Sequence, residues 1–135
     1  MPPATMVRPL RIDVCVTCRA GQPAREDGTS PGQDLYDALA AQAARDRASG
    51  WIDLRAVACL ASCARGCAMV VSQPGKWSYL LGGLGAELAA DLVAYAGAYR
   101  SSKTGVLMPS KRPASLAEAV LARIPSFTPS EDAAE

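Results

Sequence analysis

Apolar and polar positions alternate along residues 10–14, where the sequence reads LRIDV and leads into Cys15. A period of two is typical of a half-buried strand, so a strand is predicted there. The stretch WIDLRAVACL, residues 51–60, alternates in the same way, with Ile52 and Leu54 on one face. It is predicted to be a second strand that delivers Cys59 at its end.

Between these strands the apolar spacing changes to that of a helix. Ser30 suits the N-cap, Pro31 the first helical position, and Gln33 completes a capping box. Gly50 stands where a glycine stop is expected. The predicted inner face consists of Leu35, Leu39 and Ala43.

The second half of the chain predicts a hairpin and two helices. The β-prone runs 68–72 and 77–81 flank Pro74 and Gly75, which favour a turn. A helix with a packing face follows, formed by Leu84, Leu88, Leu92, Tyr95 and Tyr99. Ser115 and Glu118 form a further capping box, which predicts a short C-terminal helix.

The order strand, helix, strand, hairpin, helix predicts an α/β domain. A helical crossover makes the first two strands parallel, whereas the hairpin is antiparallel, so the sheet should be mixed, with about four strands and helices packed on it. This order is thioredoxin-like. We assign residues 10–125 to the domain, residues 1–9 to an N-terminal tail, and residues 126–135 to a flexible acidic tail, with a short helical extension at the end of the domain.

Composition narrows the function classes for this chain of 135 residues. The formal net charge of +1 gives no reason to expect nucleic acid or an anionic membrane as a partner. Neither a signal peptide nor a membrane span is found in the sequence, so a cytoplasmic protein is expected. The chain has no histidine, which excludes Ser-His and Cys-His catalytic pairs and every imidazole-ligated metal site.

The five cysteines fall into two groups, CVTC with Cys15 and Cys18, and CLASCARGC with Cys59, Cys63 and Cys67. In a reducing cytoplasm such groups favour metal ligation or redox chemistry over disulfides. Parallel strands would bring both groups to one edge of the sheet. Two thiolate pairs would satisfy the two irons of a [2Fe-2S] cluster and leave one cysteine over. Ligand type alone does not separate this centre from an all-cysteine zinc site.

Enzymatic functions are less well supported. In a thiol-disulfide enzyme the Cys-x-x-Cys pair opens a helix, whereas here the helix signal waits until Ser30, twelve residues after Cys18. No acid-base motif, phosphate-binding loop or dinucleotide fingerprint is present, and LLGGLG lacks the required spacing. We therefore expect no catalysis.

The segments VCVTCR, CLASCARGC, KWSYLLG and ARIP, within residues 10–125, resemble the DUF1636 family of predicted metal-binding proteins. The segment from Cys59 to Leu84 also resembles the second half of the thioredoxin-like [2Fe-2S] ferredoxins. These resemblances imply a [2Fe-2S] cluster ligated by Cys15, Cys59 and Cys63. In those ferredoxins the first two ligands are separated by more residues of sequence than the two that separate Cys15 from Cys18. Cys67 occupies a position where they usually carry proline, so Cys18 is expected to be the fourth ligand and Cys67 a possible substitute.

Two functions remain open at this stage. The first is a one-electron carrier that exchanges electrons with protein redox partners, a reductase and an acceptor enzyme. Some members of the family lie beside cobalamin-biosynthesis genes, which suggests a role in cobalamin-related metabolism. The second is an accessory or chaperone protein that binds zinc or cobalt through the same thiolates. The resemblance to the ferredoxins also suggests a homodimer.

Overall fold

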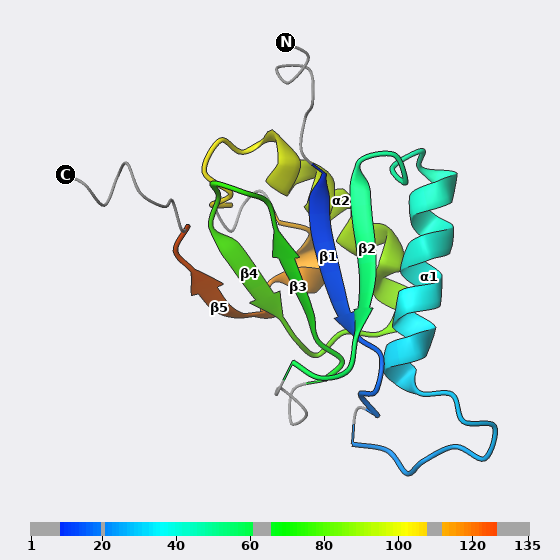
Figure 1. Ribbon diagram of the computed structural model, residues 1–135. Helices are drawn as coiled ribbons and strands as arrows, with labels where there is room; N and C mark the ends of the chain where they lie inside the picture. The colour runs from blue at the N-terminus through cyan, green and yellow to red at the C-terminus, as the bar shows by residue number, and fades with distance from the viewer. Residues whose placement is uncertain (1–8, 20, 61–65, 108–111, 127–135) are drawn as a thin grey trace.

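The computed structural model describes residues 9–19, 21–60, 66–107 and 112–126. Its five strands form a single sheet in the order β2-β1-β3-β4-β5 (Figure 1). The strands are β1 Leu10–Cys15, β2 Ile52–Val57, β3 Met69–Ser72, β4 Ser78–Leu81 and β5 Val120–Ile124. The helices are α1 Pro31–Arg45 and α2 Ala89–Ser101, with short 3-10 turns η3 Ala86–Leu88 and η5 Ala114–Leu116.

The sheet is mixed, as predicted. β1 and β2 are parallel, because α1 carries the chain back across the sheet between them. The other neighbouring pairs, β1 with β3, β3 with β4 and β4 with β5, are antiparallel. The thioredoxin-like α/β prediction is therefore confirmed, with one strand more than the four expected. The carboxyl ends of β1 and β2 lie at the same edge, at the bottom of Figure 1.

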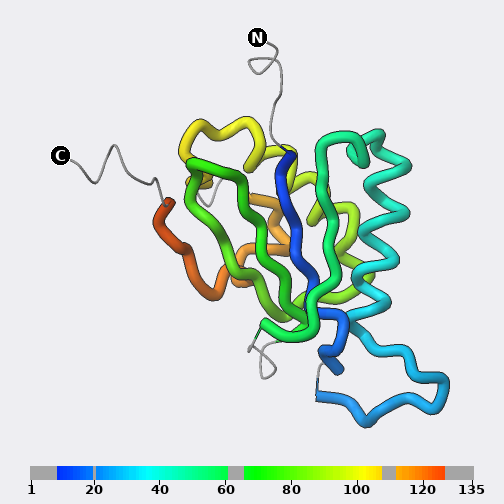
Figure 2. Tube along the Cα trace, in the orientation of Figure 1, coloured from blue at the N-terminus to red at the C-terminus, as the bar shows by residue number. Residues whose placement is uncertain are grey.

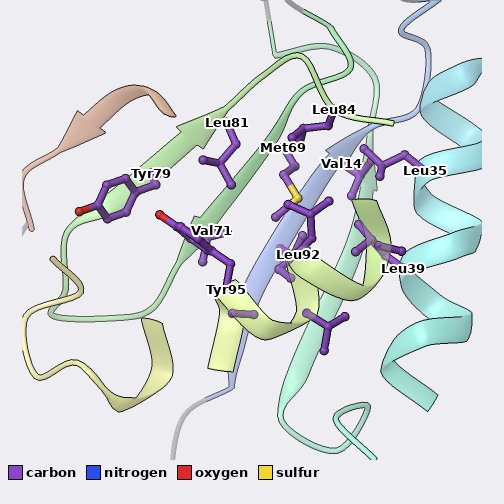
Figure 3. Packing of buried hydrophobic residues seen from close by; sticks show 14 of the residues in the cluster. Val14, Leu35, Leu39, Met69, Val71, Tyr79, Leu81, Leu84, Leu92 and Tyr95 are labelled. Carbon is purple, nitrogen blue, oxygen red and sulfur yellow. The ribbon is translucent and has the colours of Figure 1, made fainter. Parts of the chain in front are cut away.

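Both α helices pack on one face of the sheet, and the core lies between them and the strands (Figures 1 and 2). Alternate residues of the strands point into the core between the sheet and the helices, as the alternation of apolar and polar residues in the sequence predicted. Figure 3 shows the centre of the packing, where α1, α2 and the strands contribute Val14, Leu35, Leu39, Met69, Val71, Leu81 and Leu92, each almost fully buried. This burial fixes which face each strand turns to the helices, while the parallel direction of β1 and β2 brings their carboxyl ends, with Cys15, to one edge of the sheet.

The opposite face of the sheet carries ion pairs between charged side chains of the same strand. Arg11 Nε lies 2.9 Å from Asp13 Oδ1 on β1, and Arg55 contacts Asp53 at 2.9 Å on β2. Across the parallel ladder Arg11 stands beside Asp53 and Asp13 beside Arg55. No helix in the described part of the chain combines the length and apolar character needed to cross a bilayer.

Three tyrosines meet in the core at the β4 side of the sheet. The ring of Tyr79 makes edge-to-face contacts with Tyr95 and Tyr99, at centroid separations of 6.1 and 6.4 Å. The Tyr79 hydroxyl accepts a hydrogen bond from the Leu107 amide at 3.1 Å, and the Tyr99 hydroxyl donates to the Trp77 carbonyl at 2.6 Å. Burial raises the pKa of Tyr99 to about 12. The Tyr95 hydroxyl has no hydrogen-bond partner among the described residues.

Tyr79→Phe is expected to lower the free energy of unfolding by about 1–3 kcal/mol, because it leaves the buried Leu107 amide without its acceptor. The matched control is Tyr95→Phe, which removes a buried hydroxyl that has no partner in the described structure and should be neutral or stabilising. Urea denaturation of both variants measures the difference. Equal midpoints would contradict the hydrogen bond to Leu107.

The predicted start of the first helix is confirmed, and its predicted end is wrong. Ser30 is the N-cap of α1, and its hydroxyl accepts from the Gln33 amide at 3.0 Å. The Gln33 side chain does not complete the capping box, since it donates to Asp37 at 3.0 Å. The helix stops at Arg45, five residues before Gly50, because Arg47 adopts a left-handed conformation with φ of 56°.

The predicted C-terminal helix is also wrong. Residues 114–116 form only a 3-10 turn, and residues 120–124 pair with β4 as strand β5. The predicted N-cap Ser115 lies within the turn and donates to Asp91 of α2. The open backbone groups at the edge of β4 offer hydrogen bonds that outweigh the local helical signal. Of the two predicted tails, residues 1–8 and 127–135 lie outside the described residues.

Candidate metal centre

The candidate centre lies where β1 ends. Cys15 is the last residue of β1 and stands opposite Val57, the last residue of the parallel strand β2. Its amide donates to the Ala68 carbonyl at 3.1 Å, immediately before β3. Three chain segments therefore meet at Cys15, and both cysteine-bearing loops begin from this point, as the strand pattern predicted.

The thiol of Cys15 connects the two cysteine loops. Its side chain is buried, with 4% of its surface exposed, and Sγ lies 3.7 Å from the Ala58 carbonyl oxygen. The Thr17 hydroxyl donates to the same carbonyl and lies 3.7 Å from the Cys15 sulfur. Since Ala58 directly precedes Cys59, the CVTC loop and the start of the CLASC loop are in contact. The two cysteine-bearing segments therefore approach each other at Ala58.

Cys18 is held by the first turn of α1. Its side chain is 5% exposed, and its carbonyl accepts from the Gly32 amide at 3.0 Å. A Cβ at position 32 would lie 2.1 Å from the Cys15 carbonyl oxygen, so only glycine permits this approach. The Ser30 hydroxyl, besides capping the helix, donates to the Val16 carbonyl at 2.5 Å. The CVTC loop and the start of α1 thus form one packed unit.

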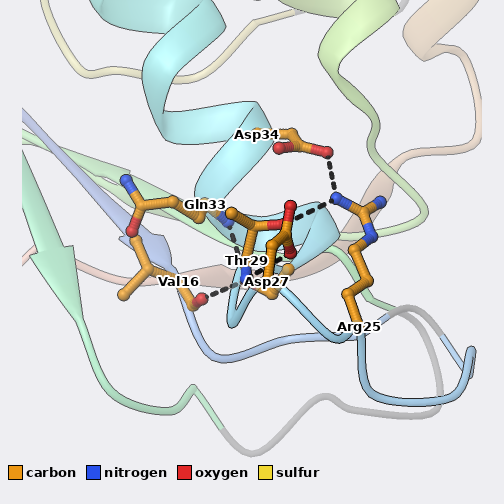
Figure 4. Close-up of polar contacts among 7 residues, drawn as sticks. Val16, Arg25, Asp27, Thr29, Gln33 and Asp34 are labelled. Carbon is orange, nitrogen blue, oxygen red and sulfur yellow. Dashed lines mark hydrogen bonds and ion pairs between the residues drawn. The ribbon is translucent and has the colours of Figure 1, made fainter.

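A polar network braces the chain just before α1 (Figure 4). Arg25 forms an ion pair with Asp34 at 2.7 Å and also contacts the Thr29 hydroxyl at 3.3 Å. Asp27 accepts from the amide and the hydroxyl of Thr29, which lowers the pKa of its carboxyl. These exposed contacts hold the loop against the helix that supports Cys18.

Cys67 lies beside Cys18 and is fully buried. Its amide donates to the Leu84 carbonyl at 3.3 Å, and the Leu84 amide donates to the Cys67 carbonyl at 3.0 Å. The Gly66–Cys67 peptide bond is cis. Burial raises the pKa of the Cys67 thiol to about 12, and the neighbouring thiols of Cys18 and Cys15 raise it further.

The predicted ligands have different environments. Cys15 and Cys18 are both buried, whereas Cys59 is exposed, two residues beyond the end of β2. Cys63 lies outside the described residues, as do Ala61, Ser62, Ala64 and Arg65. Within the described ranges no three Cys, Asp or Glu side chains gather closely enough to form a metal site by themselves. The sequence pattern did not predict that Cys67 is buried and hydrogen-bonded to Leu84, because the two residues are distant in the chain.

The donor chemistry of this edge suits a soft metal. Sulfur is the main ligand type available, and thiolates favour iron-sulfur clusters and zinc. The buried positions of Cys15 and Cys18 would keep water from one side of such a centre, while the exposed Cys59 would leave the other side near the surface. The residues present therefore fit a cysteine-ligated metal or cluster.

A family model described as a protein of unknown function, DUF1636, matches residues 12–126. The chain belongs to the DUF1636 family. The match includes all five cysteines and every strand and helix of the sheet domain except the first two residues of β1. No curated protein matches the DUF1636 chain.

Solved structures show the same fold at low sequence identity. A thioredoxin-like [2Fe-2S] ferredoxin from Aquifex aeolicus matches the DUF1636 chain with a TM-score of 0.57 and 16% identity, covering 90% of this chain and 99% of the ferredoxin. A second structure, of the wild-type ferredoxin from the same organism, has a TM-score of 0.54 at 16% identity, and the match covers 85% of this chain and 98% of the ferredoxin. A cysteine-to-serine variant of that ferredoxin matches with a TM-score of 0.52 at 18% identity, and the match covers 84% of this chain and 98% of the variant. Neither the family model nor the matching solved structures connect the DUF1636 chain with cobalamin.

Proposed function

We propose that this protein holds a [2Fe-2S] cluster and carries single electrons between protein partners. The observation that supports it best is the convergence of Cys15, Cys18 and the residue before Cys59 at one edge of the sheet. The similarity of the fold to that of a [2Fe-2S] ferredoxin supports the same proposal.

In this proposal Cys15, Cys18, Cys59 and Cys63 are the ligands. The cluster, when bound, would supply one-electron chemistry. The protein supplies the rest. Burial of Cys15 and Cys18 excludes water, and the hydrogen bond from Gly32 to the Cys18 carbonyl fixes the loop on α1. The exposed Cys59 leaves a short path between the centre and a partner's surface.

The partners in this proposal are proteins, a reductase that donates the electron and an enzyme that accepts it. The thiol chemistry requires a reducing compartment such as the cytoplasm. A homodimer and a role in cobalamin-related metabolism remain part of the proposal as the family resemblance suggests them. The competing function is a zinc- or cobalt-binding accessory protein, which would use the same thiolates.

Anaerobic purification and reconstitution test the proposal. The full chain is expected to be red-brown, to lose visible absorption on addition of dithionite, and to contain about two iron atoms and about two labile sulfides. The reduced sample should give the paramagnetic resonance signal of a single unpaired electron. A colourless chain that binds one zinc per chain and takes up no sulfide would overturn the proposal and favour the accessory protein.

A further inference from the structure

β2 is an edge strand with an open outer side. In the described part of the chain it pairs only with β1 and stands at the end of the sheet (Figure 1). The carbonyls of Trp51 and Val57 both accept hydrogen bonds at 3.0 Å from amides in or next to β1. Since successive residues of a strand direct their backbone groups to opposite sides, Leu54 and Ala56 direct theirs to the open edge. An edge of this kind can accept another strand.

The charged residues of β1 and β2 alternate in sign up to this open edge. Across the parallel ladder Asp53 lies beside Arg11, and Arg55 lies beside Asp13. Within β2, Asp53 and Arg55 form an ion pair at 2.9 Å, and their side chains stay 37% and 52% exposed. The open edge therefore presents one negative and one positive side chain, two residues apart on the same face of the strand.

Two β2 strands can pair antiparallel in three registers in which Leu54 and Ala56 face each other or themselves. Facing Leu54 with the partner's Leu54 places Asp53 opposite the partner's Arg55, and Arg55 opposite the partner's Asp53. Facing Leu54 with the partner's Ala56 places the two Arg55 side chains opposite each other. Facing Ala56 with itself leaves both charges opposite uncharged residues. Opposite charges across a strand pair stabilise it and like charges destabilise it, so the first register is favoured.

We propose that two copies of the chain form a homodimer through β2, paired antiparallel about a two-fold axis at Leu54. Each Leu54 amide donates to the partner's Leu54 carbonyl, and each Ala56 amide donates to the partner's Ile52 carbonyl. The Ile52 amide takes no part, because it already donates to the Ala48 carbonyl at 3.0 Å. A register centred nearer Ile52 would lose hydrogen bonds for the same reason.

This pairing makes the two sheets continuous and extends the charge alternation through the junction. One row of side chains reads Arg11, Asp53, the partner's Arg55 and the partner's Asp13, so every neighbour has the opposite sign. The two-fold axis generates a second, identical row. The interface is isologous, as in most closed dimers. It rests on the homodimer named in the proposed function and assigns the surface through which that homodimer forms.

The helix α1 adds a second surface to the same junction. It packs on the helix-bearing face and stands at the β2 end of the sheet in Figure 1. A two-fold axis perpendicular to the sheet places the α1 helices of both copies on the same face, antiparallel to each other. The exposed side of α1 includes Ala40, Ala41 and Ala44, whose small side chains permit close helix packing. Helix contacts would then support the strand hydrogen bonds.

Charge reversal tests this surface in the cluster-free full chain. Sedimentation velocity over a wide range of protein concentration should show the wild type passing from monomer to dimer. Arg55→Asp places two acids opposite each other, and Asp53→Arg places two arginines opposite each other, in both cases twice per dimer. Each variant should weaken dimerisation by at least about tenfold.

Mixing the two variants provides the sharpest result. In a heterodimer of Arg55→Asp with Asp53→Arg, every acid of one strand faces an arginine of the other. The equimolar mixture should therefore dimerise at a concentration at which neither variant does so alone, and misfolding cannot produce this rescue. The matched control is Arg123→Asp, which makes the same change of charge on β5 at the opposite edge of the sheet and should dimerise like the wild type.

Amide hydrogen exchange gives an independent readout. The Leu54 and Ala56 amides should exchange at least about tenfold more slowly at concentrations that favour the dimer, because the partner strand then binds them. A wild type that stays monomeric throughout overturns the homodimer and this surface together. A dimer that Arg55→Asp does not weaken, or a mixture that fails to dimerise, overturns the surface alone. Since no iron is used, none of these results bears on the electron carrier.

Discussion

Replacing Gly32 with alanine is expected to destabilise the protein by at least about 3 kcal/mol, at the upper end of what overpacking costs. The added Cβ would lie 2.1 Å from the Cys15 carbonyl oxygen and 3.1 Å from the Val16 Cα. Both neighbours are backbone atoms, so a side-chain rotation cannot relieve the clash. Either α1 or the end of β1 has to move, and the positions of Cys15 and Cys18 would change with it.

Gly97→Ala in α2 is the matched control. A Cβ there meets nothing within 4 Å, and alanine is the better helix former, so a gain of about 0.5–1 kcal/mol is expected. Urea denaturation of the two variants gives the comparison. Similar midpoints for both glycine variants would mean that α1 does not approach Cys15 as closely as described.

Serine in place of Cys15 or Cys18 is expected to reduce bound iron and sulfide by at least about tenfold, since even changes around a metal's ligands cost that much. Cys59→Ser and Cys63→Ser should have the same effect if these residues complete the ligand set. Cys67→Ser should retain the cluster, because Cys67 is anchored to Leu84 inside the core.

Iron and labile sulfide per chain, measured after anaerobic reconstitution, provide the readout. Circular dichroism of each cluster-free variant serves as the control for folding. If Cys67→Ser loses the cluster while Cys18→Ser keeps it, Cys67 takes the place of Cys18 in the ligand set. Loss in neither variant would place the centre elsewhere in the chain.

Local patterns in the sequence predicted most of the fold. Strict alternation over residues 10–14 identified β1, and Ser30 with Pro31 identified the start of α1. The errors lie where a distant part of the chain decides the structure. Residues 120–124 carry a helical pattern yet become β5, because β4 presents an open edge to them. The end of α1 depends on the left-handed backbone conformation of Arg47. Arginine rarely adopts this conformation, so the sequence does not predict it.

The candidate site was predictable as a set of residues, but its internal contacts were not. Cys15, Cys18 and Cys59 could be placed at one edge from the strand ends alone. The hydrogen bonds that join Cys67 to Leu84 connect residues far apart in the chain, and no periodicity in the sequence indicates them. The helix begins at Pro31, so the pair Cys15 and Cys18 does not open it, as predicted. The chain nevertheless returns, and the Gly32 amide binds the Cys18 carbonyl, a contact that the distance along the chain did not predict.

The hydrogen bond between the Gly32 amide and the Cys18 carbonyl closes a ring of chain, since the segment between them leaves and rejoins the domain at one place. Such a segment behaves as an Ω-loop, and lengthening one adds little closure entropy. Insertions between Pro23 and Ala24 should therefore be tolerated without moving Cys15 or Cys18, because they leave the contacts of Arg25 with Asp34 and Thr29 in place. This part of the chain is a suitable position for grafting a recognition peptide or a fluorescent label.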